Sequence, residues 1–342
     1  MNYITLNNGV KMPQLGYGVY QVTKDECERC VADALKVGYR LIDTAQSYFN
    51  EEEVGAAIAK SGIPREEIFL TTKVWIEHYG YEACRASVLE SMRKLRVDYL
   101  DLCLLHQPFG DAYGAYRALE DLYDEGKLRA IGISNFYPDR MVDLASFCRI
   151  KPQINLVEIH PHNQQAESKV WHDKYGVQME AWAPFGEGRG NLFHLPELKA
   201  IGDRYGKNVA QVILRWHLQR GIIIIPKSTH VDRMEENFRV FDFELTEEDM
   251  AAIAALDKKQ SSFFSHTDPA MVEWFVKMVE ERRKQFDSSI LGHTNASFTL
   301  DTYTHVTSDM QEAASGIVGG FMEDLFGKEL KPWQESEKTA TE

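Results

Sequence analysis

The chain has no long hydrophobic run, no excess of basic residues and no recognisable leader. Its longest run of branched aliphatic residues, Ile222 to Ile225, is far shorter than the roughly 20 residues that span a membrane. The 342 residues include 52 acidic and 38 basic side chains, for a formal net charge of −14, which argues against general nucleic-acid binding. No basic stretch followed by an apolar one opens the chain, so we expect no signal peptide. The composition is typical of a soluble globular protein without a membrane or nucleic-acid partner.

Metal-site and disulfide patterns are also scarce. The five cysteines are an odd number in a long chain, which is typical of reduced thiols and predicts a cytoplasmic location. Cys27 and Cys30 form a single C-x-x-C pair, which we interpret as two thiols one turn apart on a helix. His160 and His162 have no third ligand at a fixed spacing, so we expect a surface loop there and no metal site.

A glycine-rich phosphate loop is missing as well. The first apolar segment, LGYGV at residues 15–19, contains only G-x-G. A doubly wound nucleotide-binding sheet usually has a third glycine, and an acidic residue about 20 positions later. This absence makes the open sheet the weaker of the two α/β architectures that fit the chain.

From residue 16 onward, short apolar runs alternate with longer amphipathic stretches. Apolar residues recur three and four apart at 81–97, 111–127 and 208–221, as in helices. Several of the short runs are apolar on successive residues, as in parallel strands covered on both faces. Eight strands with seven or eight helices between them predict a (β/α)8 TIM barrel. The predicted strands lie at 15–19, 40–44, 68–75, 99–106, 128–135, 152–160, 177–184 and 222–228.

Polar or ionisable residues end nearly every predicted strand. The C-terminal ends of the strands form the active-site rim of a TIM barrel. Asp43, Lys73 and His106 would meet on this rim, and ionisable groups are rarely buried without partners. The other strand ends carry Ser134 and Asn135, Glu158, Trp182, and Lys227 with Ser228. The pattern therefore predicts the functional site at this end of the barrel.

Five segments resemble the aldo-keto reductases, and they occur in order along residues 3 to 283. They read GYRLIDTAQSYFNE, TKVW, DYLDLCLLHQP, GISNF and IPKSTHVDRMEEN. The resemblance implies reduction of a small-molecule aldehyde or ketone by hydride transfer. It also implies a catalytic group made of Asp43, Tyr48, Lys73 and His106.

These four residue types suit carbonyl reduction. Hydride addition leaves an alkoxide, so the site needs a proton donor and a group that holds negative charge. A tyrosine hydroxyl, with an ordinary pKa of ~10, is too weak an acid unless a nearby cation stabilises its anion. Tyr48 would be the general acid and Lys73 the cation. Asp43 would keep the lysine charged, and His106 would orient the carbonyl.

The resemblance further implies a nicotinamide cofactor. Ser134 and Asn135 would bind its carboxamide, and Trp182 would stack on its ring. The family commonly reads N-Q-x-E on the sixth strand, whereas Leu156 follows Asn155 here. A leucine side chain forms no hydrogen bond, so we expect that carboxamide contact to be lost or replaced.

The segment after the eighth strand predicts NADPH rather than NADH. Lys227 and Arg233 supply two cations and Ser228 a hydroxyl near the start of a helix, which suits the adenosine 2′-phosphate. In the family pattern, Glu236 and Asn237 face the adenine.

Aromatic residues near the strand ends predict an apolar pocket mouth. Tyr20, Trp75 and Phe109 would bind the substrate together with His106, and Tyr79 and Trp182 are further candidates. Each of these rings could equally be part of the packing.

Residues 285–342 differ in character from the predicted barrel domain at 1–284. The segment SSILGHTNASFTLDTYTHV resembles the end of a tyrosine recombinase, or phage-type integrase, with His293 and Tyr303 at its late histidine and its nucleophile. This tail has no arginine to hold a phosphate, and ten acidic residues against three lysines give it a charge of −7. We expect a partly helical or disordered extension, not an independent working domain.

Three function classes remain open at this point. The leading one is an NADPH-dependent reductase, which we expect to be a monomer. A DNA-binding or recombinase-related protein is suggested by the tail alone, and its charge argues against that. A non-catalytic cofactor-binding barrel would not need Tyr48 beside Lys73.

Overall fold

The computed structural model describes residues 2–290 in their backbone and residues 2–282 in their side chains. The chain divides into two compact units, residues 1–262 with 266–273, and residues 263–265 with 274–342. The eight-stranded sheet belongs to the first unit. His293 and Tyr303 lie outside the described residues, as does the predicted extension beyond Ile290.

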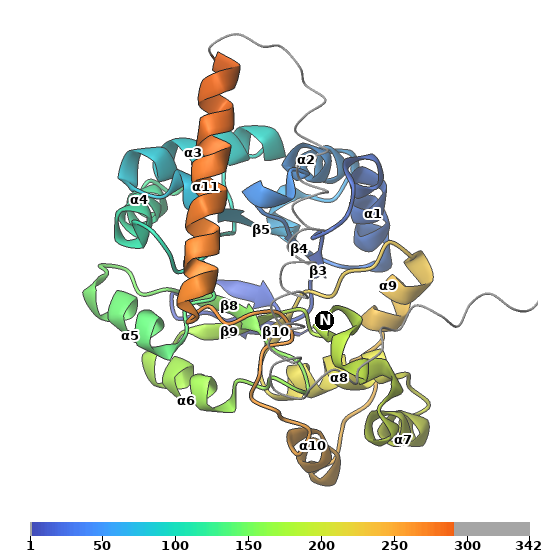
Figure 1. The fold of residues 1–342 in the computed structure, drawn as a ribbon. Helices are drawn as coiled ribbons and strands as arrows, with labels where there is room; N and C mark the ends of the chain where they lie inside the picture. Colours follow the sequence, from blue (N-terminus) through green and yellow to red (C-terminus); the bar gives the residue numbers. More distant parts are fainter. Residues whose placement is uncertain (1, 291–342) are drawn as a thin grey trace, which may run out of the picture. The chain divides into compact units, whose positions relative to one another are not determined.

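Eight parallel strands form the centre of the first unit (Figure 1). They are β3 (Tyr17–Gly18), β4 (Leu41–Asp43), β5 (Phe69–Val74), β6 (Leu102–Leu105), β7 (Ile131–Ser134), β8 (Ile154–Glu158), β9 (Gln178–Trp182) and β10 (Ile223–Ile224). The Gly16 amide donates to the Ile224 carbonyl at 2.8 Å, and the Ile224 amide donates to the Gln14 carbonyl at 3.0 Å. These bonds join the last strand to the first, so the predicted (β/α)8 barrel is confirmed.

The helices surround the strands in Figure 1 and connect them in chain order. Those that each follow one strand are α1 (Lys24–Val37), α2 (Glu51–Lys60), α3 (Tyr81–Leu95), α4 (Ala112–Asp124), α5 (Pro138–Phe147), α6 (Ala166–Tyr175) and α9 (Val231–Phe238). Two helices, α7 (Pro196–Tyr205) and α8 (Val209–Gln219), lie between β9 and β10. The chain continues with α10 (Glu247–Ala254) and α11 (Pro269–Ile290). Residue 284, the predicted domain boundary, therefore lies inside α11.

Local sequence explains where several elements begin and end. At the start of α8, Asn208 accepts from the Gln211 amide at 2.9 Å, and the Gln211 side chain accepts from the Asn208 amide at 3.1 Å. This capping box satisfies amides that would otherwise lack a partner. β10 is much shorter than the predicted last strand, 222–228. The reason is that Pro226 has no N–H to extend the ladder of hydrogen bonds.

A hairpin of β1 (Tyr3–Thr5) and β2 (Lys11–Pro13) covers the N-terminal end of the barrel. Its residues Leu6 and Met12 belong to one buried cluster with the residues that begin the strands, such as Leu41, Phe69 and Leu102. The base of the barrel is therefore closed by apolar packing, and the opposite end is left for the site.

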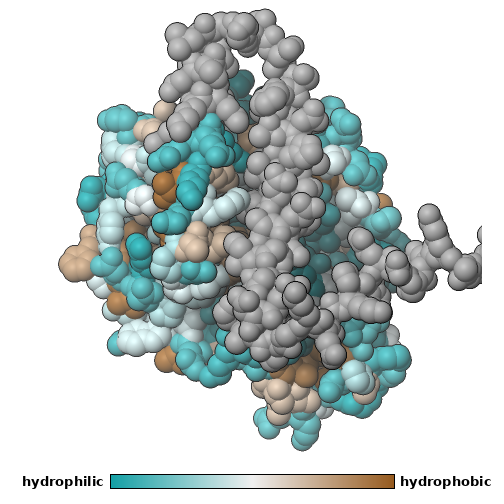
Figure 2. Space-filling view, viewed as in Figure 1, coloured by the Kyte–Doolittle hydropathy of each residue, from teal (hydrophilic) through white to brown (hydrophobic). Residues whose placement is uncertain are grey.

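Hydropathy, cysteine burial and helix length characterise the outer surface of the first unit. The part of the first unit visible in Figure 2 is mostly hydrophilic, with small separate hydrophobic areas. Cys27 and Cys30 are buried on α1 as free thiols, and burial raises the pKa of Cys27 to about 12. Among residues 2–290, no helix combines the length and apolar character needed to cross a membrane.

Candidate active site

The buried ion pair of Asp43 and Lys73 lies at the C-terminal end of β4 and β5. Lys73 Nζ donates to Asp43 Oδ1 at 2.5 Å and to the Thr44 carbonyl at 2.9 Å, and the lysine side chain is fully buried. Burial raises the pKa of Asp43, and the Lys73 ammonium counteracts that shift. The pairing explains how a cation is retained in the interior.

Tyr48 stands beside this pair on a one-turn 3-10 helix, Gln46–Tyr48. Its hydroxyl lies 3.4 Å from Lys73 Nζ, and Phe49 turns the chain with a left-handed φ of 56°. Asn50 anchors the end of the loop, because its Nδ2 donates to the Val19 carbonyl at 3.1 Å and its Oδ1 accepts from Thr44 Oγ1 at 2.8 Å. The loop therefore holds the tyrosine hydroxyl next to a buried cation.

His106 follows β6 and faces the same group. Its ring centroid lies 5.8 Å from that of Tyr48 and 5.1 Å from that of Trp75. Burial lowers the pKa of His106 well below its usual value, and the charges of Lys73 and His266 lower it further. The imidazole is therefore neutral at neutral pH. Ser47 Oγ lies 3.4 Å from its Nδ1, so a tautomer with the proton on Nε2 accepts from Ser47 and can donate to a carbonyl.

The three residues expected at the nicotinamide meet on the adjacent rim. Asn135 follows β7 with a left-handed φ of 64°, and its Nδ2 donates to the His106 carbonyl and to Ser134 Oγ, each at 3.1 Å. The Trp182 indole donates to Asn135 Oδ1 at 2.9 Å. Ser134, Asn135 and Trp182 thus form one connected group beside the predicted catalytic residues.

The departure at Leu156 has a structural counterpart. Leu156 is buried in the same apolar cluster as Leu104 and Ile225, with Trp182 packed against it. Asn155 faces outward from the barrel, where its Nδ2 donates to the Phe136 carbonyl at 2.6 Å. Neither residue offers the hydrogen bond of the usual glutamine, so the effect on the carboxamide stays a prediction.

The segment expected at the adenosine phosphate lies between β10 and the end of α9. Lys227 and Arg233 are exposed, and neither forms an ion pair with a described residue. Ser228 is buried, and its Oγ accepts from the His230 amide at 3.1 Å. Glu236 accepts from Asn208 Nδ2 at 2.9 Å, and Asn237 is buried on the same helix.

The aromatic candidates separate into two groups. The Tyr20 ring lies 5.1 Å from that of Tyr48, and Trp75 flanks His106, so both border the predicted catalytic group. Phe109 stacks on His266 at 6.2 Å between centroids. Tyr79 is instead a structural residue, because its hydroxyl donates to the Gln107 carbonyl at 2.7 Å and accepts from the Gln107 amide at 3.0 Å.

The histidines after β8 are engaged within the protein. His160 Nε2 lies 2.8 Å from Glu158 Oε1, and Glu158 Oε2 accepts from Ser261 Oγ at 2.5 Å. The expected surface loop is wrong for both histidines, since His160 is fully buried and His162 is 5% exposed. Among the described residues, no group of three potential ligands is arranged for a metal ion.

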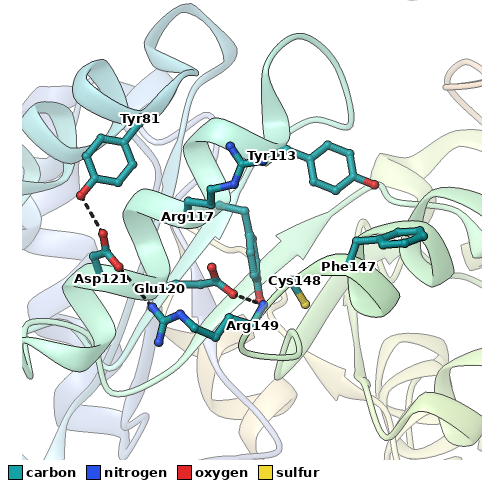
Figure 3. Close-up of a pocket in the computed structure, with 9 residues that line it drawn as sticks. Tyr81, Tyr113, Arg117, Glu120, Asp121, Phe147, Cys148 and Arg149 are labelled. Carbon is teal, nitrogen blue, oxygen red and sulfur yellow. Dashed lines mark hydrogen bonds and ion pairs between the residues drawn. The ribbon is translucent and has the colours of Figure 1, made fainter.

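A cavity of about 340 Å³ lies elsewhere, on the outside of the barrel (Figure 3). Residues of α3, α4 and the end of α5 line it, including Tyr81, Arg117, Phe147 and Arg149. None of the predicted catalytic or cofactor residues belongs to its lining. It is therefore separate from the site described above.

Several residues at the site have no sequence pattern that identifies them. Ser47 reaches His106, and Gln46 Oε1 accepts from the Trp75 amide at 3.0 Å. His266 comes from a segment more than 150 residues beyond His106 and still lies over Phe109. The rule that inward-facing strand residues line the interior could have identified Glu180 on β9, which is fully buried.

Comparisons with known proteins agree with this geometry. Residues 8–258 match the Aldo/keto reductase family. A glyoxal reductase of Bacillus subtilis (strain 168) is 47% identical over 259 residues, which cover 75% of this chain and 93% of the relative.

Two solved structures are similar as well. An aldo/keto reductase from Brucella melitensis gives a TM-score of 0.72 at 45% identity, covering 75% of this chain and 99% of that chain. An aldo-keto reductase of Bombyx mori, solved in complex with NADP, gives a TM-score of 0.73 at 33% identity, covering 77% and 95%. The family match spans most of the chain and includes Asp43, Tyr48, Lys73 and His106, so the protein belongs to the aldo/keto reductase family.

Proposed function

We propose that the protein reduces small aldehydes and ketones to alcohols with NADPH, and that Tyr48 is the general acid. The observation that supports this most directly is the position of Lys73 Nζ, 2.5 Å from Asp43 Oδ1 and 3.4 Å from the Tyr48 hydroxyl. A cation held at that position stabilises the tyrosinate that forms when Tyr48 gives up its proton.

Each residue of the group has one task in this reaction. The neutral His106 donates a hydrogen bond to the substrate carbonyl and orients it toward Tyr48. Tyr48 protonates the oxygen as negative charge develops on it. Lys73 holds the charge left on the phenol oxygen, and Asp43 keeps Lys73 protonated. The nicotinamide, when bound, supplies the hydride.

The chain's residues fit a phosphorylated nicotinamide cofactor. Asn135 and Ser134 present an amide and a hydroxyl beside the catalytic group, with the Trp182 ring fixed next to them by its hydrogen bond. Lys227 and Arg233 are two exposed cations without a described ion-pair partner, as a 2′-phosphate site requires. The similar protein from Bombyx mori, solved with NADP, supports the same assignment.

We infer that the substrates are small carbonyl compounds, among them α-dicarbonyls. Trp75 lies against His106 and Tyr20 against Tyr48, and Phe109 on His266 is a further apolar candidate for the pocket wall. The glyoxal reductase that is 47% identical supports a small dicarbonyl substrate.

The test is NADPH oxidation with a panel of aldehydes, ketones and dicarbonyls. Tyr48→Phe removes the donated proton and keeps the ring, so kcat should fall by about 10²- to 10⁴-fold with an unchanged Tm. Tyr20→Phe removes a hydroxyl from the neighbouring ring and is the matched control. An active Tyr48→Phe variant, or a wild type that reduces no carbonyl, would contradict the proposal.

We further propose that residues 285–342 derive from the end of a tyrosine recombinase and contribute no DNA activity. His293 and Tyr303 support the origin, and the absence of arginine together with the charge of −7 supports the lost function. In a mobility-shift titration at low salt, the full chain should not bind duplex DNA. Binding that disappears when Tyr303 or His293 is substituted would overturn this.

A further inference from the structure

A third ionisable side chain is buried in the barrel interior beneath the catalytic pair. Glu180, in the middle of β9, is fully buried, and neither of its carboxylate oxygens forms a hydrogen bond with a described group. A buried polar group without a hydrogen-bond partner destabilises the folded state. A purely structural role therefore does not explain why a carboxyl occupies this position.

The strand register places Glu180 relative to the pair. Inward-facing residues of a TIM barrel stack in layers of four from alternate strands. The pairings put Lys73 in the layer nearest the rim, with Gly18, Ser134 and Trp182. The next layer down contains Asp43, Leu104, Leu156 and Ile225, and the one below it contains Gly16, Thr71, Gly132 and Glu180.

Two glycines leave the layer of Glu180 almost without other side chains. A Cβ at Gly16 would lie 2.4 Å from the Leu41 side chain, and one at Gly132 would lie 2.5 Å from the Ile154 carbonyl oxygen. Thr71 is the other side chain of the layer, and its Oγ1 also forms no hydrogen bond with a described group. One layer above, Asp43 Oδ2 is unpaired in the same sense. Three polar side chains therefore share one buried region with unused hydrogen-bonding capacity.

The charged groups that act on Glu180 come from two strands. β4 supplies Asp43 and β5 supplies Lys73, and burial with the Asp43 charge raises the pKa of Glu180 to about 8 despite Lys73. The other strands around it present no charge at this level, with Gly16 on β3, Gly132 on β7, Leu156 on β8 and Ile223 on β10.

We propose that Glu180 is a positioning residue of the catalytic group, a neutral carboxylic acid whose ionisation weakens the acid function of Tyr48. This inference rests on the proposed function. A neutral Glu180 leaves Asp43 and Lys73 balanced, and its O–H is a donor for the unused Oδ2 of Asp43, directly or through a water. An ionised Glu180 adds a second anion below Asp43 and opposes the negative charge that develops on Tyr48.

The substitution that tests this is Glu180→Gln, which keeps the size and removes the ionisation. Wild-type kcat for reduction should decline as the pH rises through about 8. The variant should keep its kcat to a pH about 1 unit higher, because it lacks the carboxyl that ionises in this range. At pH 6 the kcat values of the two enzymes should agree within about twofold, since the side chain at position 180 is uncharged in both.

Thermal unfolding provides a readout independent of catalysis. A carboxyl with a raised pKa binds its proton in the folded state and releases it on unfolding, so its protein loses stability as the pH rises from the unfolded pKa to the folded one. The Tm of Glu180→Gln relative to wild type should therefore increase between pH 5 and pH 8, and stay constant above that. A Tm difference that stays constant from pH 5 to pH 9 would contradict the proposal that the Glu180 carboxyl is neutral.

The matched control is Glu51→Gln on α2. Glu51 is 3% exposed with a pKa raised by burial, but it lies outside the barrel interior and accepts from Thr72 Oγ1 at 2.7 Å. Its kcat profile should equal that of wild type. If Glu180→Gln also leaves the profile unchanged while its Tm difference varies with pH, the link to Tyr48 is wrong. An active Tyr48→Phe variant would refute the reaction scheme but leave the Tm result intact.

Discussion

The two ends of the barrel are built from the same strands and have opposite chemistry. At the C-terminal rim, Asp43 and Lys73 are buried and ionisable, and the half-buried His106 lies beside them. At the N-terminal end, Leu41 and Phe69 pack under the hairpin in an apolar cluster. Each strand changes from one environment to the other within a few residues. The N-terminal end of a strand therefore contributes to stability, and its C-terminal end to the site.

Strand β5 shows the change most clearly. Phe69, Thr71 and Lys73 all face the interior, and they run from apolar through polar to charged toward the rim. The charge is tolerated because Asp43 pairs with it, whereas the base needs only shape and apolar area. Substitutions at the rim should therefore change activity first, and those at the base stability first.

The strongest test of this contrast is Lys73→Met at the rim. It removes the cation and leaves Asp43 buried and unpaired, so stability should fall by about 3–5 kcal/mol, and kcat by about 10²-fold or more. Adding Asp43→Asn should restore much of the stability but none of the kcat. Urea unfolding and NADPH-linked kinetics measure the two effects. Recovery of kcat in the double variant would show that Lys73 is only structural.

At the base, Met12→Ala should behave in the opposite way. The side chain is fully buried in the cluster under the strands, so its loss should reduce the free energy of unfolding by about 2–5 kcal/mol. The kcat at 25 °C should equal that of wild type. Val231→Ala, at a half-exposed position, is the control for loss of an apolar side chain. A drop in kcat without unfolding would mean that the two ends are coupled.

A smaller effect is expected at the cofactor side of the rim. Arg233→Ala should raise the KM for NADPH about tenfold and leave that for NADH unchanged, because only the former has the 2′-phosphate. Arg239→Ala is the matched control, since Arg239 follows the same helix and is paired with Glu235 at 3.1 Å. Equal changes with both cofactors would remove Arg233 from the phosphate site.

The smallest effect should come from removing the tail. A chain that ends at Ile290 keeps both ends of the barrel and all of α11, so we expect its kcat/KM to match that of the full chain. Steady-state kinetics with the same carbonyl panel would measure this. A loss greater than about twofold would show that the segment beyond Ile290 contributes to the site.

Much of the site could be predicted because its chemistry is local in sequence. Asp43 and Tyr48 are five residues apart, and Lys73 and His106 each end an apolar run. The boundaries of the elements were less predictable, because β10 ends at Ile224, two residues before Pro226, and α11 continues past residue 284. Partners such as Ser261 for Glu158, or His266 for Phe109, join segments separated by more than 100 residues, and no local pattern encodes such contacts.

The alternation of strands and helices, and with it the barrel and the rim where the predicted catalytic residues meet, could be read from the amino-acid sequence. These follow from apolar periodicity and from the residue types at strand ends, which are properties of neighbouring positions. Three other roles became visible in the folded chain alone: Tyr79 supports Gln107, His160 is buried against Glu158, and Glu180 lies below Asp43. Those roles depend on the register between strands and on closure of the barrel, which bring together side chains from strands far apart in the chain.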